Sequence, residues 1–319
     1  AKLRALDKLP ANESPNARRA CRPFGDNCGF TLAESAQFVI LMDDSLALEL
    51  GATIHGSVSD VFINADGYKK SIASPGLGNY ITLAKAAASA RAIVGEDSLR
   101  RRSLVQAHGT GTPQNRVSES QLISRVASEF GIQNWRISAV KAFVGHSLAS
   151  SAGDQLMATL GLWQQDIIPG ISTVESVAED VERENLDFVL AHREVAHKSI
   201  DTVLLNSKGF GGNNATAVVL APHTTQKMLE TRHGAAALKA HSQRNEKIST
   251  AVADYDADAS KGQHRIHYRF GEGVLDATAL EFETDGLASP SALTIGSGRP
   301  RLSLSPTSPY AGLLEITKP

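Results

Sequence analysis

Three short glycine-rich stretches hold side chains that could take part in chemistry. The first, AHGTGT, carries His108; the second, KAFVGHSLASSAG, carries Lys141 and His146; the third, NSKGFGG, carries Phe210 between glycines. Two neutral imidazole N–H groups that point at one carbonyl oxygen can stabilise an enolate or oxyanion that forms there. The two histidines therefore predict a site at which a carbonyl compound gains negative charge.

The residues around the histidines fit such a site. A helix beginning after His146 would lower the pKa of its imidazole, because the helix dipole disfavours a cation at that end. Thr110 and Thr112 offer hydroxyls to an amide-bearing ligand. The glycines of the third stretch allow unusual backbone angles, so that an N–H can face the site while Phe210 covers it. Each stretch alone is explained equally well as a turn or a closely packed helix, but the three together are far more specific.

The elements that must position these stretches alternate between strand-like and helix-like from about residue 36 to residue 221, which predicts an α/β layered architecture. Residues 1–30 are polar and predict a loop, whereas the run AQFVILMDD, residues 36–44, is continuously apolar and predicts a buried strand. The remaining expected elements are strands at 52–66, 103–108 and 135–141, helices at 79–95, 118–131 and 147–166, and a hairpin at 202–221.

The pattern changes beyond residue 221. A charged, helix-prone stretch covers about 223–260, an alternating stretch at 264–284 predicts a small antiparallel sheet, and the Ser-, Pro- and Gly-rich tail from Leu287 predicts loop. His264 and His267 would face opposite sides of a strand, which argues against a metal site there.

Composition excludes several classes of protein. The 319 residues carry a net charge of -2, so no basic field favours nucleic acid. The apolar runs are far shorter than the ~20 residues of a membrane-spanning helix, and no leader pattern opens the chain. Two cysteines cannot form a disulfide framework, which favours a reducing cytoplasm. Because the first residue is Ala1 within a loop-like stretch, we expect another segment to precede it in the native protein.

The order of the three stretches, HGTGTP followed by Glu119, then K…GHS.A..AG, then S.GFGGNNA, resembles the β-ketoacyl-acyl-carrier-protein synthases and the ketosynthase domains of polyketide and polyunsaturated fatty-acid synthases. Two upstream stretches, CRPFGDNCGFTLAESAQFVILM and DGYKKSIASPGLGN, agree with it, and the resemblance covers about residues 15–221. It implies the thiolase fold, of which this chain would hold the C-terminal half and the last strands of the N-terminal half. Residues 31–221 would form the ketosynthase region, and residues 222–319 a C-terminal extension of helix and strands.

The resemblance also implies an activity and a set of roles. The reaction is a decarboxylative Claisen condensation of an acyl group with malonyl-carrier protein, in fatty-acid or polyketide synthesis. His108 and His146 resemble the pair that binds the malonyl carbonyl, and Lys141 resembles the lysine that supports them. The other implied roles are phosphopantetheine contacts for Thr110 and Thr112, an oxyanion hole and acyl gate for Gly209, Phe210 and Gly211, and a supporting network for Glu119.

The partners implied are an acyl carrier protein and a second ketosynthase-fold chain, in a homodimer or heterodimer. The phosphopantetheine arm of the carrier would bring the substrate, and no bound cofactor or metal is implied.

The chain departs from the family pattern at several positions. Asn115 and Arg116 replace the usual Gly-Asp, so a local charge is reversed, and Lys208 stands where an aromatic residue is common. The nucleophilic cysteine should lie before the first residue of this sequence. Cys21 and Cys28 stand in the loop before the first apolar run, and we expect both to be loop or packing residues rather than nucleophiles. The chain alone is therefore expected not to condense.

Two other interpretations remain open at this point. A non-catalytic partner of the chain-length-factor type would share the fold, although it has no need of two histidines and Lys141. A thiolase would carry a second catalytic cysteine near its C-terminus, and no cysteine follows Cys28. Separately, Arg100, Arg101 and Arg102 could meet an acidic carrier protein, but a solvated helix-to-strand connection is the favoured interpretation.

Overall fold

The computed structural model describes residues 2–27, 29–67, 76–263, 269–272, 274, 277–283, 292–294 and 301–303. The chain divides into two compact units, Ala1–Ala251 and Val252–Pro319, and each is described by itself. None of the described helices has both the length and the apolarity that spanning a bilayer would demand.

The first unit is built on a six-stranded sheet. Its strands, in spatial order, are β1 (Ser57–Ala65), β8 (Asn213–Leu220), β7 (Thr202–Lys208), β2 (Ser103–Gln106), β3 (Trp135–Ser138) and β5 (Leu186–Phe188). The pairs β1·β8 and β8·β7 are antiparallel, whereas β7, β2, β3 and β5 run parallel. A separate antiparallel pair joins β4 (Ile167–Ile168) and β6 (Arg193–Glu194).

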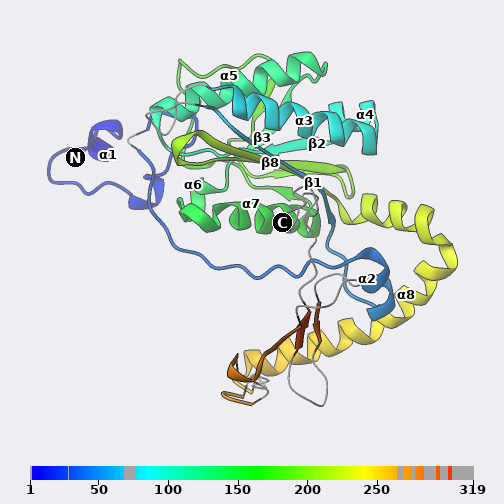
Figure 1. Ribbon diagram of the computed structural model, residues 1–319. Coiled ribbons are helices and arrows are strands. Elements are labelled where there is room, and N and C mark those ends of the chain that lie inside the picture. Colours follow the sequence, from blue (N-terminus) through cyan, green and yellow to red (C-terminus); the bar gives the residue numbers. More distant parts are fainter. Residues whose placement is uncertain are drawn as a thin grey trace, which may run out of the picture. The chain divides into compact units, whose positions relative to one another are not determined.

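Helices cover both faces of this sheet (Figure 1). One face carries α3 (Leu77–Val94), α4 (Glu96–Arg101) and α5 (Pro113–Glu129). The other carries α6 (Lys141–Val144), the 3-10 turn η2 (Leu148–Ser150) and α7 (Ser151–Gln165). The layered α/β architecture expected from the sequence is therefore confirmed.

The strand pattern explains how two cores form on one sheet. Successive side chains of a strand point to opposite faces, and in β7 Leu204 packs into the larger core with α3 and α5. Its neighbours Val203 and Leu205 pack into the smaller core, which includes Leu162 of α7. Strands that are apolar on both faces must be covered on both, so the three-layer arrangement follows from their composition.

Most of the expected elements are present at the predicted places. Helix α3 ends at Gly95, whose φ of 87° suits glycine, as the sequence indicates. Strands β7 and β8 form the predicted hairpin, with Thr202 opposite Leu220.

The strand predicted at residues 36–44 is wrong. Residues 36–43 join no strand among the described residues, and Phe38 and Ile40 are 97% and 83% exposed. A strand needs neighbouring backbone to pair with its N–H and C=O groups, and an apolar run becomes buried only where another surface covers it. The sequence pattern indicates a segment suited to burial, but of this run Gln37 donates to Asp154 of α7 while the apolar side chains of Phe38 and Ile40 stay exposed.

The N-terminal region and the next helix also differ from expectation. Residues 2–30 are not loop throughout, because Lys2–Leu6 forms α1 and Ala17–Arg19 the 3-10 turn η1. The sequence KLRAL consists of good helix formers, which outweighs the polar character of the surrounding region. Helix α2 (Asp44–Leu50) begins where Asp43 accepts from the Ser45 N–H and ends at Gly51, whose φ is 68°.

The predicted helix after residue 221 is α8 (Pro222–Ser260), and it breaks at Gly234, where φ is 83°. Within the first unit α8 packs against α2. His233 bonds to Asp44 at 2.9 Å, and Asn245 donates to the Gly51 carbonyl at 3.0 Å.

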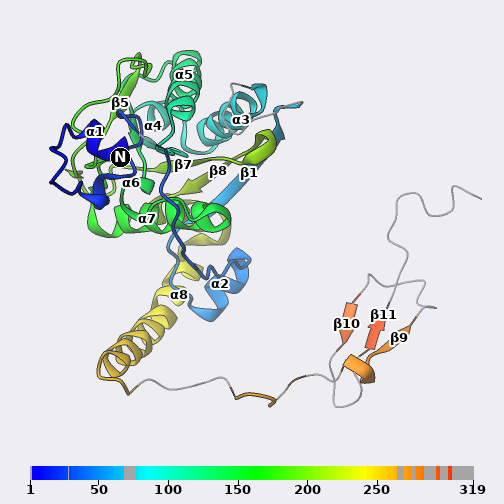
Figure 2. The same ribbon diagram turned by 90° about the vertical axis from the view of Figure 1, so that its left-hand side faces the viewer.

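The second unit contains the 3-10 turn η4 (Ala277–Ala279) and a small sheet of strand order β10-β11-β9 (Figure 2). Its strands are β9 (Glu281–Glu283), β10 (Ala292–Thr294) and β11 (Arg301–Ser303), and β9 pairs with β11 in parallel. The prediction of a purely antiparallel sheet followed by loop is therefore wrong. Alternation predicts which side chains share a face, but not which strands pair or in which direction. His264 and His267 lie outside the described residues.

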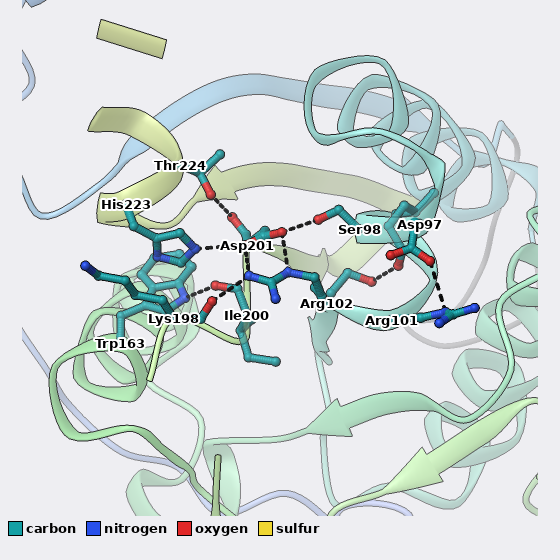
Figure 3. A network of polar contacts seen from close by, with 12 residues as sticks. Asp97, Ser98, Arg101, Arg102, Trp163, Lys198, Ile200, Asp201, His223 and Thr224 are labelled. Carbon is teal, nitrogen blue, oxygen red and sulfur yellow. Dashed lines mark hydrogen bonds and ion pairs between the residues drawn. The ribbon is translucent and has the colours of Figure 1, made fainter. Parts of the chain in front are cut away.

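A half-buried carboxylate, that of Asp201, connects the start of α8 to the sheet (Figure 3). Asp201 accepts two hydrogen bonds from Arg102, at 2.6 and 2.7 Å, and further bonds from Ser98 and His223. Thr224 donates to the backbone carbonyl of Asp201 at 3.2 Å. Burial raises the pKa of Asp201, but the hydrogen bonds from Arg102, Ser98 and His223 outweigh it and hold this pKa well below its usual value. We call these five residues the Asp201 network.

The arginine cluster before β2 is accounted for by such contacts. Arg100 pairs with Glu96, Arg101 with Asp97 at 3.0 Å, and Arg102 with Asp201. These contacts support the favoured interpretation, a solvated helix-to-strand connection, for Arg100 and Arg101, whereas Arg102 is half-buried against Asp201.

Candidate active site

The three glycine-rich stretches meet because they follow three neighbouring parallel strands. His108 comes directly after β2, Lys141 and His146 after β3, and Phe210 after β7. The carboxyl ends of parallel strands lie at one edge of a sheet, and ligands bind in the crevice there. Residues separated by about a hundred positions in sequence are thereby brought together.

The two histidines lie against each other. Their ring centroids are 5.3 Å apart with the planes at 83°, and the side chains of His108 and His146 belong to residues only 6% and 8% exposed. Nδ1 of His146 accepts the Leu148 N–H at 3.2 Å. A neutral ring that accepts at Nδ1 carries its proton on Nε2, so Nε2 of His146 is a hydrogen-bond donor.

Both imidazoles are held in the neutral form. Burial lowers the pKa of His108 well below its usual value, assisted by the positive charge of Lys141. Burial and then Lys141 lower the pKa of His146 to about 4, while Asp154 opposes them. The direction agrees with the sequence analysis, but the cause differs. His146 is separated from α7 by η2, and burial and Lys141, not a helix dipole, account for the shift.

Lys141 is the first residue of α6 and lies close enough to both histidines for its charge to lower their pKa values. It is 1% exposed, and its Nζ has no hydrogen-bond partner among the described residues. Burial lowers the pKa of Lys141 to about 8, against the fields of Glu119, Cys21 and Asp154, which raise it. The ammonium is therefore charged at neutral pH, and its charge is available to the site.

Glu119 holds the backbone that carries His108. Its carboxylate accepts the N–H groups of His108 and Gly109 at 2.7 and 2.9 Å, and the side-chain amides of Asn115 and Asn206 at 2.8 and 2.7 Å. All four donors are uncharged, so the carboxylate orients the loop without neutralising Lys141 by contact. We call Glu119 and its partners the His108 cluster.

Sequence reasoning missed part of this support. Asn115 appeared only as a departure from the family pattern, and Asn206 opens the third stretch without having been singled out. Gln155 donates to the backbone carbonyls of Gln106, Ala107 and Asn206. No spacing in the sequence marks it, because its partners lie on β2 and β7.

A cavity of about 540 Å³ opens over the histidines. Of the predicted site residues, six line it and three do not. Those that line it are His108, His146, Thr110, Thr112, Gly209 and Phe210, whereas Lys141, Glu119 and Gly211 lie outside the lining. The hydroxyls of Thr110 and Thr112 lie 3.1 Å apart and bond to each other, and Phe210 is half exposed at the rim. Phe30 and Lys208 also line the cavity.

Two further expectations concern Arg116 and the cysteines. The charge that Arg116 reverses has its own partners, because its guanidinium pairs with Asp180 at 2.7 Å and with Asp26 at 3.5 Å. Cys21 is buried near Lys141, and Cys28 lies outside the described residues.

Comparisons with known proteins agree with the fold and the motifs. Residues 55–175 match the family described as "Beta-ketoacyl synthase, C-terminal domain". The Beta-ketoacyl-[acyl-carrier-protein] synthase FabY of Pseudomonas aeruginosa is 53% identical over 286 residues, which are 89% of this chain and 45% of FabY. The crystal structure of the noncanonical ketosynthase FabY matches with a TM-score of 0.84 and 46% identity, over 98% of this chain and 48% of that one. The ishigamide ketosynthase/chain length factor matches at 26% identity with a TM-score of 0.53, over 66% of this chain and 48% of that one.

Fold and sequence together define a thiolase-like ketosynthase. The chain belongs to the β-ketoacyl-acyl-carrier-protein synthases of the thiolase superfamily. It spans about half the length of the curated relatives it matches. The match to the FabY structure includes nearly all of the chain, and so most of the extension after residue 221, for which the motifs indicated no relative.

Proposed function

We propose that this chain carries the decarboxylation site of a β-ketoacyl synthase, and that a segment outside this sequence supplies the nucleophilic cysteine. The observation that carries the proposal is the pair of neutral, buried histidines at 5.3 Å beside the charged Lys141. Both histidines line a cavity large enough for a substrate arm.

The proposed chemistry uses this chain's own groups in the second stage of condensation. N–H groups of His108 and His146 donate to the thioester carbonyl oxygen of a malonyl group. The bond between C2 and the carboxylate breaks, carbon dioxide leaves, and the electron pair moves into an enolate whose oxygen the two donors stabilise. The Lys141 ammonium favours this negative charge and keeps the imidazoles neutral, so that they donate without giving up a proton.

In the condensation itself, C2 of the enolate attacks the acyl thioester on the cysteine, and the cysteine leaves as thiolate. Thr110 and Thr112 would contact the phosphopantetheine arm of an acyl carrier protein. The backbone N–H groups around Phe210 would stabilise the oxyanion that forms in the second step. A carrier protein, a second ketosynthase-fold chain and a cytoplasmic location remain parts of this proposal.

The exposed apolar run at residues 36–42 supports the proposal that a segment outside this sequence packs against the chain. Phe38, Ile40 and Leu41 are all largely exposed on one extended segment, and contiguous apolar surface of this kind marks a site of contact. We assign it to contact with the segment that carries the nucleophile.

The test is malonyl decarboxylation. Malonyl-carrier protein is incubated with the protein, and conversion to acetyl-carrier protein is followed by mass spectrometry. Replacing both histidines, H108A together with H146A, should reduce the rate by at least ~100-fold, because two oxyanion donors are lost. His197→Ala is a matched control, since His197 is exposed and pairs only with Asp166 among its described contacts.

A second outcome separates this function from the chain-length-factor alternative. If the double variant decarboxylates malonyl groups as fast as the wild type, the histidines are not the donors and the non-catalytic interpretation gains. With an acyl donor and no malonyl group, the chain alone should form no covalent acyl-enzyme, and an adduct on Cys21 or Cys28 would overturn the assignment of the nucleophile.

A further inference from the structure

The loop that carries His146 is paired with a segment from far earlier in the sequence, residues 31–37. The His146 N–H donates to the Thr31 carbonyl at 2.7 Å, and the Ala33 N–H donates to the His146 carbonyl at 3.1 Å. Gly145, whose φ is 71°, allows this approach, because a Cβ there would lie 2.9 Å from the Thr31 carbonyl oxygen. The backbone of His146 is therefore fixed by a short bridge to the earlier segment.

The imidazole of His146 is oriented by a contact within its own loop. Its Nδ1 accepts the N–H of the peptide that joins Ser147 to Leu148, at 3.2 Å. Leu148 has a φ of 58°, a left-handed conformation that a bulky residue adopts only where its surroundings enforce it. A group that holds Ser147 in place therefore also sets the direction of the imidazole and of its Nε2–H donor.

The carboxylate of Asp154 holds Ser147. Asp154 is a buried residue in the first turn of α7. One of its oxygens accepts the Ser147 hydroxyl at 2.5 Å, and the other accepts the side-chain amide of Gln37. Hydrogen bonds to an ionised acceptor are about twice as strong as bonds between neutral groups. The carboxylate thus joins the His146 loop, the start of α7 and the segment 31–37 at one point.

We propose that Asp154 is a positioning residue: through Ser147 it fixes the peptide whose N–H His146 accepts, and so keeps the Nε2–H of His146 aimed at the thioester carbonyl oxygen. Asp154 does not belong to the described lining of the cavity, so it acts through His146 and not on the substrate. The inference rests on the proposed function and adds to it how one of the two donors is held. Donors stabilise a developing oxyanion fully only when they are already in position, so a small displacement lowers the rate.

The bonds of Asp154 must be separated from its charge. Burial and Lys141 lower the pKa of His146, and the charge of Asp154 opposes them, so its field also reaches the imidazole. Asp154→Asn removes the charge and can keep both bonds, because the amide oxygen can accept from Gln37 and the amide N–H can donate to the Ser147 hydroxyl oxygen. If the bonds position His146, this variant should retain most of the rate.

The test is a double-mutant cycle on malonyl decarboxylation by the full chain, followed by mass spectrometry. Asp154→Ala should lower kcat about tenfold and change KM by less than about twofold, because a transition-state contact is weakened while the cavity lining is intact. In the H146A background Asp154→Ala should have no further effect, whereas in the H108A background it should still lower kcat about tenfold. A residue that only stabilises the fold would act alike in both backgrounds.

A second pair of variants tests the same contact from the other side, and also serves if Asp154→Ala does not fold. Ser147→Ala removes the hydroxyl that Asp154 accepts and should reduce kcat severalfold, whereas Ser147→Thr keeps it and should retain most of the rate. Asp60→Ala is the matched control, because Asp60 likewise accepts a serine hydroxyl, that of Ser89 on α3, and neither residue belongs to the described lining of the cavity. It should leave kcat unchanged.

The outcomes are distinct. If Asp154→Ala keeps the wild-type kcat, or slows the H146A and H108A proteins equally, this inference is wrong. It is also wrong if Asp154→Asn is as slow as Asp154→Ala, since the charge and not the bonds then matters. In each of these cases a slow H146A protein leaves the proposed function standing. If H146A itself reacts at the wild-type rate, His146 is not a donor, and the proposed function and this inference are overturned together.

Discussion

Two carboxylates in this molecule, the half-buried Asp201 and the buried Glu119, are satisfied in opposite ways. Asp201 accepts two hydrogen bonds from the guanidinium of Arg102 and also contacts His223. A positive charge therefore lies directly beside its negative charge. Glu119 is met by four uncharged donors, while Lys141 nearby keeps an ammonium without a hydrogen-bond partner among the described residues. The Asp201 network is arranged for stability. Beside the His108 cluster, the buried ammonium of Lys141 lowers the stability of the fold, because no hydrogen bond from a described residue compensates its burial. Destabilising charges of this kind are concentrated where proteins bind and react.

The largest effect is expected in the Asp201 network. Asp201→Ala leaves the half-buried Arg102 without its partner and removes bonds to Ser98 and His223, so the free energy of unfolding should fall by about 3 kcal/mol. Urea denaturation measures it, and Arg101→Ala, which breaks only an exposed pair, is the control. The folded-state pKa of Asp201 is lowered, so its contribution is present above the unfolded pKa of about 3.9 and is lost as pH falls below it. A decrease of less than 1 kcal/mol in the free energy of unfolding would contradict the contrast between the Asp201 network and the His108 cluster.

The opposite sign is expected at Lys141. Lys141→Met removes a buried charge that no hydrogen bond compensates, so at pH 7 it should raise the free energy of unfolding by about 2 kcal/mol while abolishing malonyl decarboxylation. The folded pKa of about 8 lies below the unfolded value near 10.4. Between these two values the unfolded state binds more protons, so wild-type stability should rise with pH, and the variant should lack this rise. Destabilisation by the substitution at pH 7 would contradict the comparison.

A smaller effect should appear on the acid side. His146 has a folded pKa of about 4 and an unfolded value near 6.5, so the unfolded state gains a proton first and stability falls as pH drops through this interval. His146→Asn retains an acceptor for the Leu148 N–H and should make the loss between pH 6 and pH 5 shallower by about 1 kcal/mol. Urea titrations at both pH values measure it. Parallel curves for the two proteins would mean that the ring is not held neutral.

The smallest effect concerns the edge of the Asp201 network. Thr224→Val preserves the shape of the side chain and removes its bond to the Asp201 carbonyl, so the loss should be about 0.5–1 kcal/mol. Thermal unfolding followed by circular dichroism measures it, and the decarboxylation rate should not change. If Thr224→Val lowers the free energy of unfolding as much as Asp201→Ala does, the bond from Thr224 to the Asp201 carbonyl, and not the contact of His223 with the Asp201 carboxylate, holds α8 to the sheet.

The sequence predicted the site better than it predicted the support of the site. His108, His146 and Phe210 stand in stretches whose glycines and small residues are visible without a structure, and the structure brings all three to one edge of the sheet. Gln155 and Asn206 carry no local signal, because each acts through partners on other elements. The Asp201 network was equally unpredictable, because the sequence placed Arg102 in a basic cluster that we interpreted as solvated, and its pairing with Asp201 joins distant parts of the chain.

At residues 36–44 the local sequence signal is strong, but the structure does not follow it. Its composition is that of a buried strand, as is that of β7, yet β7 is buried and Phe38 is almost fully exposed. Composition records that a segment is suited to burial, but pairing and cover come from the rest of the fold.

The sequence by itself determined the alternation of strands and helices, the ends of α3 and of the β7–β8 hairpin, and the motifs that identify a ketosynthase. These depend on local rules: side-chain period, glycine at positive φ and the spacing of residues along the chain. Only the tertiary structure decided that Lys141 is buried close to two neutral imidazoles, that Lys208 lines the same cavity as they do, and that Asp201 is paired. Burial and charge–charge distance are properties of the packed molecule, and they set the pKa values on which the chemistry depends.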